Sequence, residues 1–446
     1  MEEFEIVIVG AGAAGEAAAS LAAGRRARVA IVDRELFGGS CPFWACMPSK
    51  ALLHAAAVHH AGGDYPWPKA SDFRDYMINR EHTDWPDDAS HVEALEKAGA
   101  TVIRGTARFA APGRLTVEAD GSTRELEAKA VIVAVGSHSR IPDLPGLAEA
   151  QAWTNREATS TRELPRSLVI LGGGPTGVEL SQVYARYGVP VTLIDSNQRI
   201  NSRDHPRSSA ILAAALERDG VKIRTGVRAQ RIRQSDGTSV VELSDGTSVE
   251  GAALLVAIGR EIPVDELNLP AIGVAVEGGR VKPDDRLRIA ENVYVAGDIA
   301  GPELHTHLAH YEGEMAARLA LGDDVKPDVS AIPRATYTEP ETASVGLLLD
   351  QAREAGIDAA ELTQDLATTS KGYVAEAQGH VTIVVDRANR TLVGAFMAGP
   401  GVSEAIHEAV LAVKTHTPLS VLADTIHAFP TVARVLGGLF AEADRA

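Results

Sequence analysis

Short apolar runs that end in glycine-rich turns recur along the chain. Residues 5–9 (EIVIV) have the pattern of a buried strand, an alanine-rich stretch to about residue 23 has the pattern of a helix, and residues 27–32 have that of a second strand. Short apolar runs bounded by turn residues are typical of strands covered on both faces, as in parallel sheets. The pattern therefore predicts a strand–helix–strand unit at the start of the chain.

The turn between the first strand and the helix has the sequence G-A-G-A-A-G. In this pattern Gly10 permits a tight turn, Gly12 lets the backbone approach a pyrophosphate, and Gly15 lets the helix pack closely on the strand. Asp33 ends the second strand 23 residues after Gly10, where a carboxylate can accept hydrogen bonds from ribose hydroxyls. A glycine-rich turn alone is weak evidence, but strand, turn, helix and acid in this order predict a dinucleotide site.

The same arrangement occurs a second time. Residues 168–171 have a strand pattern, the turn G-G-G-P-T-G supplies Gly172, Gly174 and Gly177, and Asp195 ends the next strand 23 residues after Gly172. Two such units imply two bound dinucleotides.

The residues around Asp195 bear on the choice between NADH and NADPH. A carboxylate at this position accepts a ribose 2′-hydroxyl and repels a 2′-phosphate, which favours NADH. Arg199 lies nearby and could contact a phosphate, which keeps NADPH as an alternative. It could also be a surface arginine that does neither.

The remaining segments support a coarser prediction. Residues 61–100 indicate a helical excursion, and residues 101–109 and 114–118 indicate short strands, with a hairpin turn at Asp120 and Gly121. Residues 131–135 and 254–259 each have the pattern of a closing strand of a nucleotide-binding half, and residues 291–298 that of a further strand that ends in Gly-Asp. From residue 331 the pattern is α+β, with strands at 381–385 and 392–397 and a helix over 403–413.

Length and charge limit the number of domains and the classes of partner that we expect. A chain of 446 residues is expected to form about two or three domains. A net charge of −17 argues against a nucleic-acid partner, because such proteins carry a basic face. The sequence starts directly in a strand pattern and has no uncharged apolar stretch of about 18 residues, so we expect a cytoplasmic protein with no membrane partner.

Cys41 and Cys46 are the only cysteines of the chain. Pro48 suits the first turn of a helix that runs to His60, so Cys46 is expected near a helix N-terminus, where the dipole favours a thiolate. A structural zinc usually takes about four Cys or His ligands, and the sequence has no second cysteine pair. We interpret the pair as a redox-active disulfide; two unreactive buried thiols are the alternative.

The segment around these cysteines, GGSCPFWACMPSK at 38–50, resembles the active-site signature of the pyridine nucleotide-disulfide oxidoreductases, such as dihydrolipoamide dehydrogenase, glutathione reductase and mercuric reductase. Later segments extend the resemblance over nearly the whole chain: VGS at 135–137, GD at 297–298 and TEPETASVG at 338–346. It implies an α/β fold with two Rossmann-like doubly wound domains and a C-terminal α+β dimerisation domain. The expected boundaries are 1–148 and 271–325 for FAD, 149–270 for NAD(P) and 330–446 for dimerisation.

The resemblance also implies roles for individual residues. Electrons would pass from NADH through FAD to the disulfide, with Cys46 next to the flavin and Cys41 meeting the substrate. Lys50 and Glu179 would form an ion pair beside the flavin, and Asp298 would accept a hydrogen bond from the ribityl chain. The set expected to bind the cofactors is completed by Gly39, Ser40, Gly136, Gly259 and Gly297.

The histidines at 305, 307 and 310 form an H-x-H-x-x-H pattern, which could indicate a metal site. In the family resembled, position 307 commonly holds a histidine that lies against the flavin without binding metal. We therefore expect His307 to serve the cofactor and expect no metal.

The last motif, 427–434, departs from the family, which has H-x-H-P-T followed by a glutamate. Phe429 stands where the family has its acid/base histidine, Arg434 replaces the glutamate that orients it, and His427 aligns with the other histidine. A positioned base contributes about 10²–10⁴-fold, so the acceptor is the uncertain part of the prediction. Phe429 could instead fill space at the dimer interface, with His427 or water as the acid.

A homodimer with composite active sites is expected, and the main prediction is reduction of a small disulfide. The alternatives are reduction of a soft metal ion or a quinone, a carboxylase resembling 2-ketopropyl-coenzyme M oxidoreductase/carboxylase, and electron transfer to a protein partner. Phe43 and Trp44 between the cysteines could narrow the face of the disulfide, stack on a substrate, or simply pack in the core.

Overall fold

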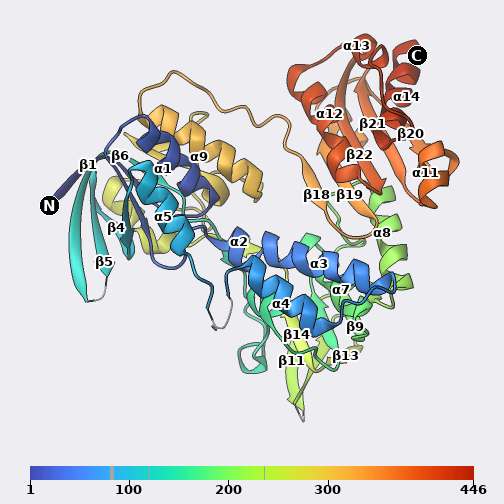
Figure 1. Cartoon of the computed structure of the whole chain (residues 1–446), viewed down its shortest axis with the longest axis horizontal. Helices are drawn as coiled ribbons and strands as arrows, with labels where there is room; N and C mark the ends of the chain where they lie inside the picture. Colours follow the sequence, from blue (N-terminus) through green and yellow to red (C-terminus); the bar gives the residue numbers. More distant parts are fainter. Residues whose placement is uncertain (81–84, 120, 236) are drawn as a thin grey trace. The chain divides into compact units, whose positions relative to one another are not determined.

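The computed structural model describes residues 1–80, 85–119, 121–235 and 237–446, and the chain divides into two compact units (Figure 1). The first unit comprises Met1–Ala51, Ser71–Arg140 and Gly259–Pro327, and the second comprises Leu52–Ala70, Ile141–Ile258 and Asp328–Ala446.

The first unit is built on a sheet with the strand order β16-β17-β6-β1-β2-β3. All neighbours pair in parallel except β16 and β17. The bounds are β1 Glu2–Val9, β2 Val29–Asp33, β3 Thr101–Arg104, β6 Ser122–Val133, β16 Arg288–Ala290 and β17 Val293–Val295. The predicted strand–helix–strand unit is confirmed as β1, α1 (Ala13–Gly24) and β2, whereas the strand predicted over 131–135 ends at Val133.

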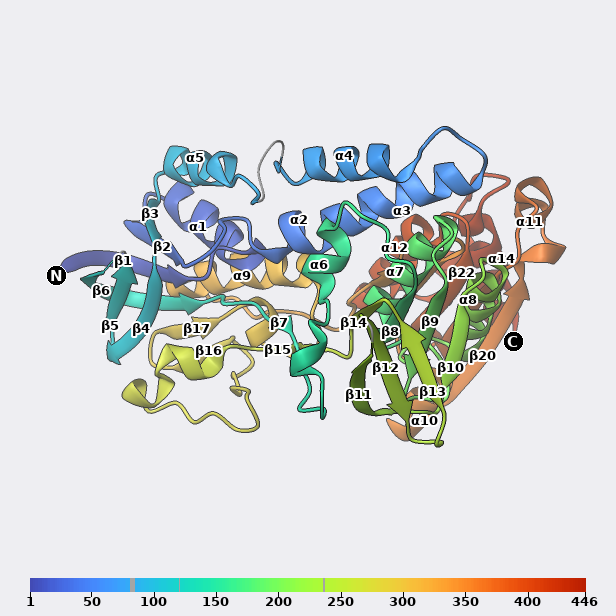
Figure 2. The same cartoon turned by 90° about the horizontal axis from the view of Figure 1, so that it is seen from below.

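Both faces of this sheet are covered, as the continuous apolar runs predicted. Ile6 and Ile8 pack with residues of α1 and of α9 (Thr306–Ala320), while Val7 and Val9 face a second cluster that includes residues of β5 and of the 3₁₀ turn Val264–Leu267. Helices α1 and α9 lie side by side (Figures 1 and 2). Their backbones approach so closely that a Cβ at Gly313 would lie 2.1 Å from the carbonyl oxygen of Ala14.

The predicted excursion after the cysteine segment is helical. It contains α4 (Trp67–Met77) and α5 (Ala89–Ala98) and is followed by the strands β4 (Thr106–Ala111) and β5 (Arg114–Ala119). The hairpin turn predicted at Asp120 and Gly121 includes Asp120, which lies outside the described residues.

The second unit contains a parallel sheet in the order β10-β9-β8-β14. Its strands are β8 Leu168–Leu171, β9 Val191–Asp195, β10 Lys222–Thr225 and β14 Ala253–Val256, with the helices α6 Asn155–Ser160, α7 Pro175–Arg186 and α8 Pro206–Arg218 (Figure 2). This confirms the second strand–loop–helix–strand unit. The sequence did not reveal the antiparallel strands β11 Ala229–Ser235, β12 Thr238–Leu243 and β13 Ser248–Gly251.

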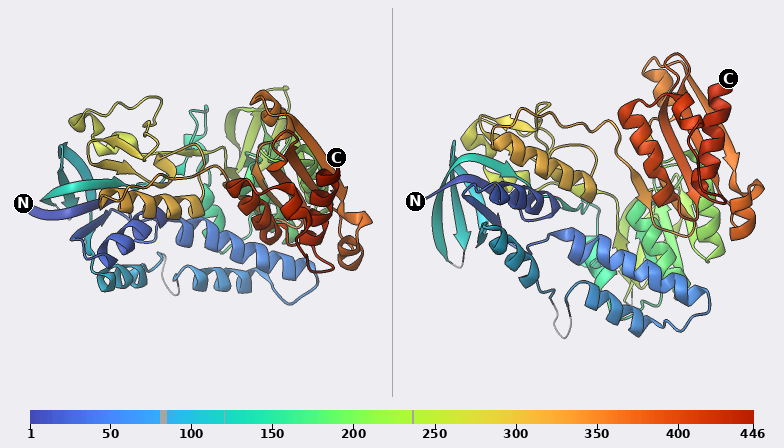
Figure 3. Two further views of the ribbon diagram at one scale, coloured as in Figure 1. Left: turned by 90° about the horizontal axis from the view of Figure 1, so that it is seen from above. Right: turned by 45° about the horizontal axis from the view of Figure 1, so that its top comes forward.

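The C-terminal part of the second unit is an antiparallel sheet in the order β18-β19-β22-β21-β20. Its strands are β18 Arg334–Thr336, β19 Glu341–Gly346, β20 Ala359–Asp365, β21 His380–Asp386 and β22 Thr391–Gly399. The helices α12 Val402–Thr415, α13 Leu419–Ala423 and α14 Val432–Arg445 pack on it (Figure 3), and α10 Leu349–Glu354 and α11 Ser370–Ala375 lie between its strands in sequence. The predicted β21, β22 and α12 are confirmed.

Candidate active site

Residues predicted to hold FAD lie at one edge of the sheet in the first unit. Because β17, β6, β1 and β2 run parallel, their carboxyl ends meet at the same edge. Gly297 follows β17, Gly136 follows β6, Gly10 follows β1, and Asp33 ends β2. This edge is where open α/β sheets bind their ligands.

The glycines at this edge let backbone segments approach one another where any side chain would collide. Gly10 has a φ of +103°, and a Cβ there would lie 2.3 Å from the carbonyl oxygen of Ala134. A Cβ at Gly15 would lie 1.8 Å from the carbonyl oxygen of Gly10, and one at Gly39, where φ is +71°, would lie 2.6 Å from Cα of Gly12. The loop therefore presents bare backbone at the N-terminus of α1, which fits the pyrophosphate of FAD.

Two carboxylates border this cradle: Asp33 is half-buried and Asp298 is buried. Asp33 accepts hydrogen bonds from the backbone N–H groups of Ala11 at 2.7 Å and of Glu35 at 2.8 Å, and burial raises its pKa. Asp298 is 8% exposed; it accepts a hydrogen bond from Ser137 Oγ and lies 3.4 Å from the guanidinium of Arg260. Asp33 fixes the glycine loop, and Ser137 and Arg260 fix Asp298.

The cysteines lie on two consecutive helices, α2 (Ser40–Trp44) and α3 (Cys46–His60), and both cysteines belong to the first unit. Cys46 begins α3, as Pro48 predicted, and its Sγ lies 3.4 Å from Thr306 Oγ1 at the first residue of α9. Both cysteines are half-buried free thiols. The hydrogen bond to Cys46, together with burial, raises the pKa of the Cys41 thiol well above its ordinary value.

The two aromatic residues between the cysteines are part of the core. Phe43 and Trp44 are buried with Leu36 and Ile78, the Trp44 ring meets Trp85 edge-on at 5.2 Å, and the Phe43 ring meets that of His91 at 5.5 Å. Of the roles considered for this pair, the geometry supports packing, which holds α2 in place.

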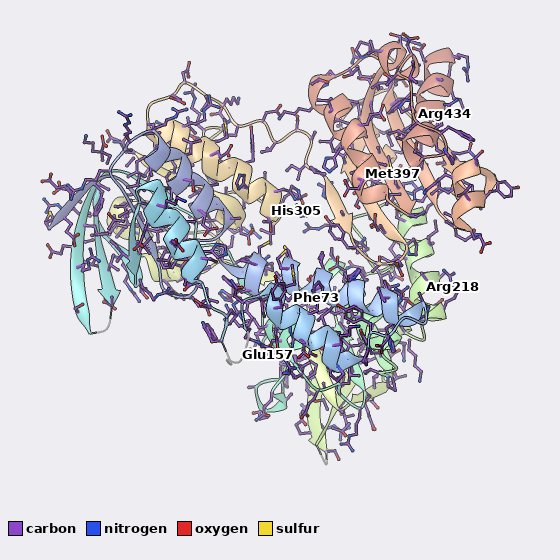
Figure 4. The ribbon with its side chains drawn as sticks, viewed as in Figure 1. Phe73, Glu157, Arg218, His305, Met397 and Arg434 are labelled. Carbon is purple, nitrogen blue, oxygen red and sulfur yellow. The ribbon has the colours of Figure 1, made fainter. Side chains whose placement is uncertain are left out.

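The histidines at the start of α9 are arranged around Thr306. Figure 4 shows His305 at the N-terminal end of this helix. Its ring stacks on that of His307 at 5.1 Å, and its Nε2 lies 3.2 Å from the carboxylate of Glu303. Within the described part of the chain, no group of three or more His, Cys, Asp or Glu residues is placed to hold a metal ion.

The second glycine loop lies at the carboxyl edge of the sheet in the second unit. Gly172 has a φ of +109°, and a Cβ at Gly177 would lie 1.9 Å from the carbonyl oxygen of Gly172. Asp195 accepts hydrogen bonds from the backbone N–H groups of Gly173 and Asn197, both at 2.6 Å. Arg199 donates to the carbonyl oxygen of Asp204 and to Ser209 Oγ, so its guanidinium is held by the start of α8. The bare backbone at Gly174 leaves room for a pyrophosphate here as well.

The predicted partners Lys50 and Glu179 belong to different units, and their ion pair stays a prediction. Glu179, on α7, is 4% exposed and accepts a hydrogen bond from the backbone N–H of Tyr337 at 3.0 Å. Lys50, on α3, donates to Ser49 Oγ at 3.4 Å. Gly259, the last residue of the predicted cofactor set, accepts a hydrogen bond through its carbonyl oxygen from the backbone N–H of Arg140.

The C-terminal motif has one buried and two exposed side chains. The His427 side chain is 6% exposed and its Nε2 lies 2.8 Å from Glu408 Oε1. Its ring also touches α14, where a Cβ at Gly437 would lie 2.4 Å from it. Phe429 is 72% exposed, and Arg434 is exposed on α14 (Figure 4). His427 is thus engaged in packing, which argues against it as a substitute acid.

Comparison with known proteins defines the class. A family model described as pyridine nucleotide-disulphide oxidoreductase matches residues 4–313, and the model of the family's dimerisation domain matches residues 332–438. The chain belongs to the pyridine nucleotide-disulphide oxidoreductases. It is an enzyme of the FAD-dependent kind that uses NAD(P)H to reduce a disulfide, which confirms the predicted family, fold class, cofactors and reaction. The dimerisation domain supports a homodimer.

Individual relatives cover almost the whole chain. Dihydrolipoyl dehydrogenase of Halobacterium salinarum is 33% identical over 96% of this chain and 94% of its own length, and mercuric reductase of Bacillus cereus is 30% identical over 97% and 70%. Among solved structures, the Cu(II) complex of the HOCl-induced flavoprotein disulfide reductase RclA from Escherichia coli has a TM-score of 0.89 at 25% identity, covering 99% of this chain and 100% of that one. LpdA from Mycobacterium tuberculosis has a TM-score of 0.87 at 27% identity, covering 100% and 99%.

The helices of the described residues include none that is long and apolar enough to cross a membrane. Sequence reasoning missed Thr306 as part of the site. Thr306 lies inside the histidine pattern, and a hydroxyl at the start of a helix that follows the GD turn is the signal that could have drawn attention to it.

Proposed function

We propose that the protein is an NADH-dependent FAD enzyme that reduces its acceptor through the pair Cys41 and Cys46. The observation that carries the proposal is the position of Cys46, whose sulfur lies 3.4 Å from Thr306 Oγ1 at the start of α9. Helix α9 follows the Gly297–Asp298 turn, and all of these residues belong to the first unit. The reactive thiol and the residues expected to hold FAD are therefore parts of one compact unit.

FAD, when bound, would convert a hydride from NADH into the electron pair that opens a disulfide. The chain would hold it with the cradle of Gly10, Gly12 and Gly15, with Asp33 and with Asp298, while Gly39 and Ser40 lead into the cysteine helix. Gly136, Gly297 and His307 complete the first site. Gly172, Gly174, Gly177, Asp195 and Gly259 would serve NADH, and the Lys50–Glu179 pair would lie beside the flavin. The inward contacts of Arg199 support NADH over NADPH.

In the thiol pair, Cys46 is the thiolate next to the flavin and Cys41 is the exchange thiol. Cys41 must lose its proton before it can attack a disulfide, yet its pKa is raised by its hydrogen bond to Cys46 and by burial. A base is therefore needed, and Phe429 cannot act as one. Disulfide exchange should therefore be slow in this protein. Acceptors that need no base at this position, such as a quinone or a soft metal ion, would be reduced without this disadvantage.

The proposed assembly is a homodimer with composite active sites. Leu411, Val421, Ile426 and Phe429 are all more than half exposed in the single chain, and they lie on α12, on α13 or in the segment between α13 and α14. Covering such apolar side chains is favourable. The proposed domains are 1–148 with 271–325 for FAD, 149–270 for NADH and 330–446 for dimerisation. A pair of redox thiols also suits a reducing compartment, so we propose a cytoplasmic location.

Anaerobic titration with NADH tests the electron path. The FAD-loaded protein should take up about two NADH per chain, one for the flavin and one for the disulfide, because each couple takes two electrons. The Cys46→Ser variant should take up about one. Uptake of one equivalent by the wild type, or no flavin in the purified protein, would contradict the proposal.

Restoring the base tests the account of the acceptor. Phe429→His is expected to raise turnover of small disulfides about tenfold or more, the lower end of what a positioned base contributes, while quinone and Hg²⁺ or Cu²⁺ turnover changes little. Steady-state rates over this panel measure the effect, with Phe429→Leu as the control for the change in side-chain size. Equal disulfide rates in Phe429→His and Phe429→Leu would show that the missing base is not the limiting feature.

A further inference from the structure

Glu312 is a buried carboxylate that the proposed reaction does not use. It lies on α9, is 5% exposed, and its Oε2 accepts a hydrogen bond of 2.9 Å from the backbone N–H of Gly297. Among the described residues, no lysine, arginine or histidine forms an ion pair with it. A buried carboxylate without a cation is costly when ionised, so its presence here needs a physical reason.

The backbone that Glu312 holds is the turn that carries Asp298. Gly297 has a φ of +77°, and a Cβ there would lie 3.2 Å from Cβ of Ala309 and 3.3 Å from Cβ of Ala14, so the turn is wedged between α9 and α1. Its N–H is buried and would lose its acceptor without Glu312. On the other side of the turn, Ser137 and Arg260 hold the carboxylate of Asp298.

The charge on Glu312 is set by its surroundings. Burial raises its pKa to about 7, and the negative charge of Asp298 acts in the same direction. The titratable groups on the other elements that pack here have partners of their own. Glu16 of α1 contacts His91 of α5, and the hydroxyl of Tyr294 on β17 donates to the carbonyl oxygen of Leu319 on α9. The guanidinium of Arg260 lies 3.4 Å from the carboxylate of Asp298. The hydrogen bond from Gly297 favours the ionised form of Glu312, and burial and then Asp298 raise its pKa against that contact.

We propose that Glu312 is a positioning residue for the cofactor pocket, which holds the Gly297–Asp298 turn through the Gly297 amide and is protonated when the pocket is occupied. This inference rests on the proposed role of Asp298 towards FAD. A protonated carboxyl group still accepts the hydrogen bond from Gly297 through its carbonyl oxygen, without placing a second charge beside Asp298. The bound FAD brings its own negative pyrophosphate, so its arrival favours the protonated form further. FAD should bind more weakly as pH rises and Glu312 ionises.

The test is FAD binding to the deflavinated protein, measured by flavin fluorescence between pH 6 and pH 9. For the wild type, the dissociation constant is expected to rise about tenfold per pH unit once Glu312 ionises. Glu312→Gln keeps an acceptor for Gly297 and carries no charge, so its affinity should match that of the wild type at low pH and stay nearly constant. Glu312→Ala removes the acceptor and should bind FAD about tenfold or more weakly than the wild type does at low pH, with little dependence on pH.

Glu314→Gln is the matched control, because Glu314 lies on the same helix but is exposed and paired with His310; it should keep the wild-type pH profile. Infrared spectra of the FAD-loaded protein give a second readout, in which a protonated-carboxyl band at pH 6 should be missing in Glu312→Gln. A wild-type pH profile in Glu312→Gln, or wild-type affinity in Glu312→Ala, would overturn the inference. If the wild type binds no FAD at any pH, the proposed function fails instead.

Discussion

The two glycine loops of this chain have almost the same geometry and very different surroundings. Gly10 and Gly172 have φ values of +103° and +109°, and a Cβ on them would lie 2.3 and 2.2 Å from the carbonyl oxygens of Ala134 and Ala257. In both loops the aspartate that ends the second strand binds the N–H of the residue after the first glycine. The same strand–loop–helix–strand unit thus gives the same loop conformation in both places.

What differs is the chain that faces each loop. The turn at Gly39, which begins the cysteine helix, lies directly against Gly12, whereas a Cβ added at the equivalent Gly174 would have no heavy atom of a described residue within 4 Å. The first loop is therefore packed against the turn that begins the cysteine helix, whereas the described residues leave the second loop open at the corresponding position. Under the proposed function, the shared motif binds a phosphate in both sites and its neighbours decide which chemistry each site serves.

The largest effect on FAD binding is expected when a side chain is placed at the contact between Gly39 and Gly12, which the second loop lacks. Gly39→Val places a Cβ 2.6 Å from Cα of Gly12 and puts a β-branched residue at a φ of +71°, where side chains are strained. The loop or the turn must shift, and we expect FAD retention to fall about 100-fold or more, corresponding to about 3 kcal/mol of strain. Flavin content after purification and the FAD dissociation constant measure this.

The matched change in the second loop is Gly174→Ala, where the added methyl group meets open space. FAD retention should be unchanged, and only the KM for NADH should rise. Equal loss of FAD in both variants would contradict the distinction between the loops.

The second unit should respond to acid in a way that the first does not. His380 is 2% exposed in the C-terminal sheet; its Nε2 lies 2.9 Å from Ser208 Oγ on α8, and its Nδ1 lies 2.8 Å from Thr382 Oγ1. Burial, with the nearby charges of His205 and Arg207, lowers its pKa to about 3. The folded pKa is thus below the value of about 6.5 in the unfolded chain. The contribution of neutral His380 to the free energy of unfolding is fully present above the unfolded pKa of about 6.5. It is lost by about 1.4 kcal/mol per pH unit as the pH falls from there towards the folded pKa of about 3.

Urea unfolding of the FAD-saturated protein at pH 7.5, 6 and 5 measures this loss. The free energy of unfolding of His380→Gln should depend less on pH than that of the wild type, by about 1.4 kcal/mol per pH unit. His416→Gln, at an exposed position after α12, is the control and should follow the wild type. Parallel pH curves for the wild type and His380→Gln would show that the imidazole is not the titrating group.

The local parts of both sites were predictable because they are encoded by neighbours in sequence. Strand β1, the glycine loop and α1 follow from an apolar run and from three glycines, and the start of α3 at Cys46 follows from Pro48. The family resemblance identified the thiol pair for the same reason, since its signature is one continuous segment.

The contacts that complete the sites join residues far apart in sequence. Cys46 and Thr306 are 260 positions apart, and Ser137 and Asp298 are 161 apart, so no periodicity connects them. Phe43 and Trp44 are equally apolar whether they pack or bind substrate, and only the tertiary neighbours Leu36 and Ile78 show that they pack. The antiparallel strands β11, β12 and β13 escaped detection because polar residues interrupt their apolar positions, as in β11 (AQRIRQS).

The smallest effect concerns the hydroxyl next to Cys46. Thr306→Val keeps the shape of the side chain and removes the Oγ1 that lies 3.4 Å from the sulfur, and the same hydroxyl acts to lower the pKa of Cys41. The reduced pair should therefore form thiolate less readily, and its alkylation by iodoacetamide at neutral pH should slow about tenfold, as expected for the loss of one hydrogen bond to a charged group. Thr306→Ser should react like the wild type. Because the second loop contains no thiol, the KM for NADH should be the same in both variants. A changed KM would mean that the two loops are coupled. An unchanged rate of alkylation would mean that the helix terminus alone activates the thiol.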